Sequence, residues 1–206
     1  MQNKQNTAQM PPSTIIQNDK IIFNDYPYKP SSVCKGNGVL LAKDIVAYIT
    51  LPNAFVVVNR HLGAPFYELI AMRYATSDEI ATFAKRNGLR KLNHTDNWIY
   101  LLEEYLDTEY SQETHENFME RLRKNGFLAQ EIATIKAKEG KMVLWCNSFA
   151  WEWIMLDVFS LLHFELHNPK GAIKYLLFPK KFDDFYKRAM TIALKGAKLK
   201  LPKTSL

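Results

Sequence analysis

Two histidines, His163 and His167, are four residues apart, a spacing that allows two imidazoles to bind one metal ion from a single helix. No third ligand stands at a recognisable spacing from them, and the sequence contains no HExxH pattern. The alternative is that both side chains lie at the end of an apolar helix, where a cationic group interacts favourably with the helix dipole. We therefore predict no metal site, and keep the pair as a binding candidate.

Glu152 lies between Trp151 and Trp153 in an apolar run that extends from residue 142 to 165. Neighbouring side chains project about 100° apart on a helix, so this helix is expected to be covered on more than one side and Glu152 to be partly buried. A buried carboxylate must be paired, hydrogen-bonded or protonated. Glu152 either forms an ion pair with Arg188 or a C-terminal lysine, or is an acid with a shifted pKa at a ligand pocket. We favour the ion pair, and keep these three residues as binding candidates.

An acidic cluster precedes residue 110 and consists of Glu103, Glu104, Asp107 and Glu109. Paired carboxylates can perform acid–base chemistry or hold a divalent cation. A solvated helix face has the same composition, and Asp107 with Thr108 can end one helix by bonding to nearby backbone. We favour this structural interpretation over a site, since Asp and Thr bond locally to backbone at turns.

No catalytic motif accompanies the two cysteines, Cys34 and Cys146. A cysteine nucleophile needs a positioned base, which neither position offers. A glycine-rich phosphate loop, a serine elbow and a nucleotide fingerprint are also missing, so we expect no cofactor and lean against an enzyme. Two cysteines form at most one disulfide, which predicts a reducing, cytoplasmic environment. The polar segment 1–20 lacks the apolar core of a secretory signal.

The run Met142–Phe164 is long enough to cross a bilayer. Glu152 and Asp157 lie within it, and each acidic side chain costs about 2.5–3.5 kcal/mol at the centre of a membrane helix. We therefore predict a buried helix of a soluble domain and no membrane span.

The first half of the chain has the pattern of short strands. Residues 1–20 are rich in Gln, Asn and Pro and are expected to form a disordered tail. β-Branched and aromatic runs, with a tight turn at residues 36–38, predict an antiparallel sheet of about four or five strands. A capping box at Thr76 and Glu79 starts one helix, and Asn87-Gly88 ends it. Residues 21–93 thus form a small α+β unit.

From residue 94 onward the apolar spacing becomes helical. Helices are expected from Thr95, from Ser111 to Asn125, over 128–138, over 142–165 after a break at Gly140, and over 181–195. The predicted fold class is α+β, in which a small antiparallel sheet with one helix is followed by a C-terminal helical bundle. The bundle occupies residues 94–197, and residues 198–206 form a basic tail.

The positive charge is concentrated at the C-terminus. Residues 170–206 carry ten Lys or Arg against two Asp, a balance of +8, which leaves −2 for the rest of the net +6. Nucleic-acid binding usually adds stacking aromatics to such charges. Here Phe182, Phe185 and Tyr186 share one helix stripe and are predicted to face inward. Only weak, non-specific nucleic-acid binding is expected.

Several short motifs occur in a characteristic order along the chain. They are Tyr26-Pro27-Tyr28-Lys29-Pro30, Lys43-Asp44-Ile45, Phe83-Ala84-Lys85, Tyr105 to Thr108, Asn125-Gly126, Trp151-Glu152-Trp153 and Ala189-Met190. In this order the chain resembles a set of uncharacterised, hypothetical bacterial proteins. The resemblance implies a bacterial cytosolic origin. It implies no activity, so no functional residue is carried over.

These observations leave three classes of function. We predict first a non-enzymatic protein that binds another protein, as a regulator or an immunity-type partner, because catalytic motifs are missing and aromatics that could act as interface anchors are abundant. The first alternative is a nucleic-acid-binding protein that uses the basic C-terminal segment. The second is an enzyme with an unrecognised site near Glu152, His163 and His167.

Overall fold

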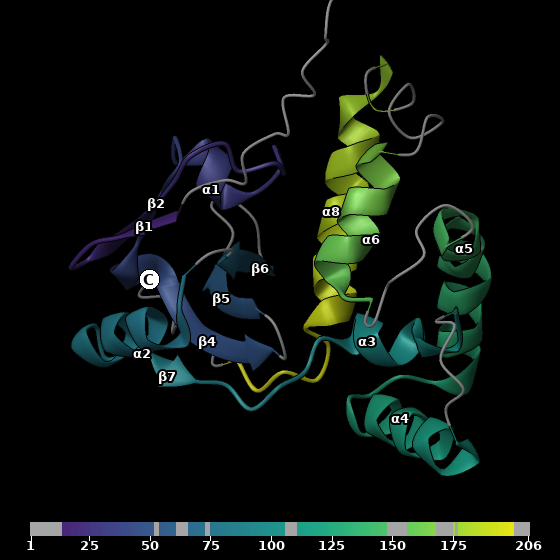
Figure 1. Cartoon of the computed structure of the whole chain (residues 1–206). Coiled ribbons are helices and arrows are strands. Elements are labelled where there is room, and N and C mark those ends of the chain that lie inside the picture. Colours follow the sequence, from purple (N-terminus) through teal and green to yellow (C-terminus); the bar gives the residue numbers. More distant parts are fainter. Residues whose placement is uncertain are drawn as a thin grey trace, which may run out of the picture. The chain divides into compact units, whose positions relative to one another are not determined.

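The protein is described by a computed structural model, in which the chain divides into two compact units. The first unit consists of residues 1–64 and 70–91, and the second of residues 65–69 and 92–206. The fold class is α+β, as the sequence predicts (Figure 1). The division after Lys91 lies close to the expected one at residue 93. The structure describes residues 14–51, 54–60, 66–72, 75–105, 111–147, 156–167, 175 and 177–199.

The strands form two sheets, where the sequence suggested one. The first is antiparallel with the order β1-β2-β3, and the second has the order β6-β5-β4-β7, in which β4 and β5 are antiparallel and β4 and β7 parallel. In chain order, the strands of the two sheets and the helices between them are β1 (Thr14–Ile16), β2 (Lys20–Phe23), α1 (Ser32–Lys35), β3 (Val39–Leu41), η1 (Ala42–Asp44), β4 (Ile45–Leu51), β5 (Ala54–Arg60), β6 (Tyr67–Met72), α2 (Ser77–Arg86) and β7 (Arg90–Lys91).

The prediction that residues 1–20 form a disordered tail is wrong from residue 14 onward. Strand β1 pairs with β2, so that Ile15 lies opposite Ile22 and Ile16 opposite Ile21. β-Branched pairs of this kind stabilise a two-stranded ladder, and the sequence pattern of three residues was too short to reveal it. Residues 1–13 lie outside the described part of the chain.

The turn at residues 36–38 follows a short helix and not a strand. The Ser31 side chain accepts a hydrogen bond from the Val33 amide and caps helix α1. Gly38 has a φ of +79°, and a Cβ there would lie 2.6 Å from the Phe23 carbonyl oxygen. This close approach allows β3 to pair with β2, and it requires glycine.

An apolar core fills the first unit between its sheets and helix α2. Strands β2 and β4 and helix α2 contribute side chains that are nearly or fully buried, among them Ile21, Ile45, Ile80 and Phe83. The capping box of α2 is confirmed, because Thr76 and Glu79 exchange bonds between side chain and backbone. Its C-terminal cap at Asn87 is confirmed as well.

The second unit consists of helices. They are α3 (Asn97–Leu101), η2 (Glu103–Tyr105), α4 (Gln112–Lys124), α5 (Ala129–Asn147), α6 (Val158–His167) and α8 (Pro179–Ala193). Helix α3 packs against α4, α5 and α8, and α6 lies beside α8 (Figure 1). The stripe of α8 is buried as predicted, including Phe182, Phe185 and Tyr186.

Several helix boundaries differ from the expected ones. Asp96, not Thr95, caps α3, whereas the predicted cap of α4 at Ser111 is confirmed. Helix α5 continues through Gly140, where a Cβ would lie 2.2 Å from atoms of the Tyr105 ring, so that glycine permits a close contact and does not break the helix. The predicted helix 142–165 is divided between α5 and α6, with residues 148–155 outside the description. Among the described helices, none has the length and apolarity needed to cross a membrane.

The segment 65–69 belongs to the second unit through its contacts with α8. Glu68 is fully buried and accepts a hydrogen bond from the Tyr186 hydroxyl at 2.7 Å. The Leu69 amide donates to the sulfur of Met190 at 3.3 Å. The second unit therefore requires five residues that precede β6 and begin it, far from the rest of the unit in sequence.

Candidate functional site

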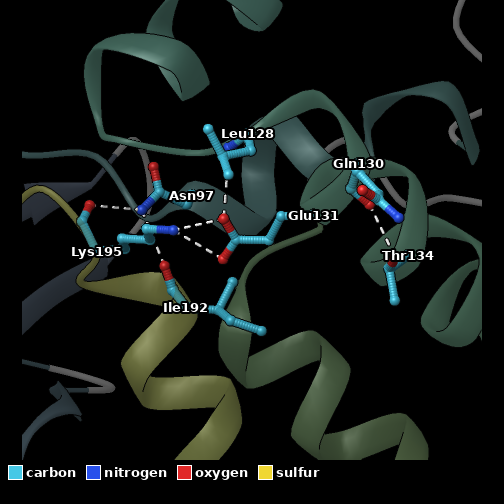
Figure 2. A network of polar contacts seen from close by, with 7 residues as sticks. All are labelled: Asn97, Leu128, Gln130, Glu131, Thr134, Ile192 and Lys195. Atoms are coloured by element: carbon cyan, nitrogen blue, oxygen red, sulfur yellow. Dashed lines mark hydrogen bonds and ion pairs between the residues drawn. The ribbon is translucent and has the colours of Figure 1, made fainter.

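A buried amide, Asn97, occupies the centre of the polar network in the second unit (Figure 2). Its Nδ2 donates to the carbonyl oxygens of Ile192 and Lys195, each at 2.9 Å, and its Oδ1 accepts from Asn125 at 2.6 Å. The last carbonyls of a helix have no partner within the helix. Asn97 therefore satisfies the C-terminal end of α8.

Lys195 connects the same end of α8 to the start of α5. Its ammonium lies 2.7 and 2.6 Å from the two carboxylate oxygens of Glu131, as Figure 2 shows. It also lies 4.4 Å from the centroid of the Phe127 ring. Glu131 in turn accepts from the Leu128 amide at 3.4 Å, just before the helix begins. Both side chains of this ion pair are partly exposed, so the pair contributes little to the free energy of unfolding. Its main effect is to align the end of α8 with the start of α5.

Asp96 bonds to two helix N-termini at once. One oxygen accepts from the Trp98 amide at 2.9 Å and the other from the Val158 amide at 2.7 Å. Burial, and secondarily the neighbouring Asp157 carboxylate, raises the pKa of Asp96 from its ordinary 3.8 to about 7, while the two amide bonds oppose this rise. The carboxylate fixes the start of α3 relative to the start of α6.

His94 and Trp98, on either side of Asp96 and Asn97, also donate hydrogen bonds to helix backbone. The Trp98 indole donates to the carbonyl of Ala189 at 2.9 Å, and His94 Nε2 donates to that of Ala193 at 2.9 Å. Burial lowers the pKa of His94, which keeps its imidazole neutral near pH 7. His94, Asp96, Asn97 and Trp98 thus bond mainly to the backbone of neighbouring helices. Its role is structural, and the sequence signal for it was an Asp-Asn pair directly before an apolar helix.

A second polar cluster joins α5, α6 and α8. Arg188 pairs with Glu139, which is 6% exposed, and the Tyr175 hydroxyl donates to Glu165. Burial raises the pKa of Glu139, an effect that the charge of Arg188 opposes. Burial and the Glu165 carboxylate also raise the pKa of Tyr175. The sequence suggested Arg188 as a partner of Glu152. Arg188 pairs with Glu139, a residue that the sequence analysis did not single out.

The two candidate histidines lie on the exposed side of α6. Their rings stack with centroids 3.9 Å apart, and His167 Nδ1 bonds to the His163 carbonyl at 2.9 Å. Because a carbonyl only accepts, Nδ1 carries the proton and is not available to a metal. Within the described ranges, no group of three His, Cys, Asp or Glu side chains is placed to hold a metal ion.

The remaining sequence candidates have different outcomes. Trp151, Glu152 and Trp153 lie outside the described residues, as do Asp107 and Glu109. The interpretation of the acidic cluster as a solvated face is wrong for Glu103, which is 4% exposed. It holds for Glu104, an exposed residue that pairs with Lys136 at 2.6 Å.

Large apolar side chains are exposed at a few positions. Leu177 and Phe178 are 65% and 52% exposed and directly precede α8, and Leu128 is 73% exposed before α5. The Lys181 ammonium lies 4.2 Å from the centroid of the Phe178 ring. Sequence reasoning missed the pair, since no periodic pattern distinguishes it from the buried residues of α8.

A scan against protein families, a search of curated proteins and a search of solved structures each gave no match.

Proposed function

We propose that this protein is a non-enzymatic binding protein, a regulator or an immunity-type partner, that contacts another protein through Leu177 and Phe178. The observation that carries the proposal is the exposure of these two consecutive apolar side chains, 65% and 52%, at the start of a well-packed helix. Scattered single apolar residues need no explanation, but an adjacent leucine and phenylalanine form an anchor suited to a partner pocket.

The backbone of Phe178 is tied to the first turn of α8. The Lys181 amide donates to the Phe178 carbonyl at 3.0 Å, and Pro179 occupies the first helical turn. Proline fixes φ and suits this position. An anchor that is already ordered loses little conformational entropy on binding, which favours affinity.

The contribution of the anchor can be worked from its exposure. Burying a leucine or phenylalanine side chain completely contributes about 1.5–3 kcal/mol. Scaled by the exposed fractions of Leu177 and Phe178, 65% and 52%, the pair contributes about 1.8–3.5 kcal/mol, or roughly 20- to 400-fold in Kd. Lys180 and Lys181 are exposed beside it, so a partner with an apolar pocket and an acidic rim is complementary.

The alternatives have less support. Arg188 and Lys195 of the basic segment are engaged by Glu139 and Glu131. Lys180 and Lys181 are exposed, but Phe182, Phe185 and Tyr186 of α8 face the interior and are not available to stack on bases. The buried polar groups of segment 94–98 end on helix backbone, which argues against an enzyme site there. A bacterial and cytoplasmic setting is part of the proposal.

The test is co-purification from the native host with a photo-reactive amino acid at position 177, compared with the same residue at position 128. A specific adduct from position 177 is expected to identify the partner. The Leu177→Ala/Phe178→Ala variant should then bind that partner roughly 20- to 400-fold more weakly, whereas Leu128→Ala should bind like the wild type. Equal binding by the double variant and the wild type would refute the proposed contact.

A further inference from the structure

A buried carboxylate oxygen near the start of α4 has no hydrogen-bond partner among the residues that the structure describes. Glu103 is 4% exposed, and its Oε2 stands out among the described side chains as a buried atom left without such a bond. Leaving a buried acceptor unsatisfied costs about 1–3 kcal/mol, and more for a charged group. Such a cost is commonly retained where the group serves a ligand or a reaction.

An imidazole lies beside this oxygen. His115 Nδ1 lies 3.5 Å from Glu103 Oε2, just beyond ordinary hydrogen-bond distance. A buried carboxylate that accepts from Nδ1–H fixes the tautomer of a histidine and leaves Nε2 with a free lone pair. Such pairs are often long in the unliganded state and shorten when a ligand binds.

His115 lies in the wall of a surface hollow on α4. The hollow has a volume of about 610 Å³, and its lining includes Glu113, Glu116, Glu120 and Arg123. Three carboxylates against one guanidinium give these side chains a negative balance. Gln112 donates to Glu116 at 3.0 Å, and Lys124 pairs with Glu120 at 2.7 Å, so both carboxylates are held on the helix surface.

We propose that this hollow binds a ligand that carries a guanidinium or primary ammonium group, with His115 as the contacting acceptor and Glu103 as the residue that positions it. The acidic lining attracts the cation, and in the tautomer with the proton on Nδ1 the Nε2 lone pair accepts one of its N–H bonds. Glu103 acts through His115: when the ligand binds and the pair shortens, its oxygen accepts from Nδ1–H and holds the proton there. The proposal is independent of the contact at Leu177 and Phe178.

The first measurement is the tautomer of His115, read from the ¹⁵N shifts of its ring nitrogens in the full-length protein. The wild type is expected to hold the proton on Nδ1, and Glu103→Gln to shift the population toward the proton on Nε2. A merely structural Glu103 would leave the tautomer unchanged on substitution. A wild-type ring with its proton on Nε2 would overturn the proposal.

The second measurement is a titration with arginine amide, followed by amide shifts and calorimetry. Saturable shifts are expected at residues 113–120, and Glu103→Gln or His115→Gln should weaken binding about tenfold or more. His163→Gln, at an exposed helical histidine elsewhere, is the matched control and should bind like the wild type. A peptide with one internal arginine distinguishes a side chain of a protein from a small amine as the natural source. Failure of arginine amide to shift α4, or equal affinity in His115→Gln, would refute the site even if Glu103→Gln is unstable.

Discussion

Replacing Asn97 by alanine removes the centre of the capping network at the end of α8. The substitution deletes two bonds to the carbonyls of Ile192 and Lys195 and the bond from Asn125. At about 1 kcal/mol net per bond, the loss is about 3 kcal/mol in the free energy of unfolding. For a chain of this length that corresponds to a fall of about 6–12 °C in Tm.

Asn97→Asp sharpens the test because it preserves the shape of the side chain. The donor that faces the α8 carbonyls becomes an oxygen, so acceptor meets acceptor in a fully buried position. We expect the Asp variant to lose at least as much stability as the Ala variant. The assay is thermal and urea unfolding followed by far-UV circular dichroism.

Asn117→Ala is the matched control, since Asn117 is exposed on α4 and its truncation should change stability by less than about 0.5 kcal/mol. If Asn97→Ala unfolds at the same temperature as Asn117→Ala, the network does not stabilise the helix end and the reasoning fails.

Three further predictions concern neighbouring positions. The pKa of Asp96 is raised from an ordinary 3.8 to about 7, so between about pH 4 and 7 the folded state binds more protons than the unfolded state, and the free energy of unfolding should fall as pH rises. Urea unfolding at several pH values measures this slope. Asp96→Asn should flatten it, and an unchanged slope would contradict the prediction. Trp98→Phe should cost about 1–3 kcal/mol, because the Ala189 carbonyl loses its buried donor; melting like the wild type would show that this bond contributes nothing. Gly140→Ala would ordinarily stabilise a helix by about 1 kcal/mol, yet here a Cβ meets the Tyr105 ring, so Tm should fall, and Tyr105→Ala in the same chain should restore it.

The sequence predicted the local features well, since capping boxes and amphipathic stripes depend on residues within one or two helical turns. The caps at Thr76 and Ser111 and the buried stripe of α8 are examples. The polar contacts of the second unit depend on residues that are far apart in the chain. Glu139 meets Arg188 across 49 positions, and no spacing rule indicates such a pair. The free oxygen of Glu103 was hidden for the same reason, because an acidic run has the same composition whether solvated or buried.

The contact between segment 65–69 and α8 has a consequence for synthesis of the chain. Glu68 and its partner Tyr186 are 118 residues apart. Ribosomes add about 5–20 residues per second, so Glu68 emerges about 6–24 s before the hydroxyl that donates to it. During that interval the segment must stay hydrated or be held by a chaperone. Nascent chains that stall before α8 lack these contacts, and we expect quality control to recognise them.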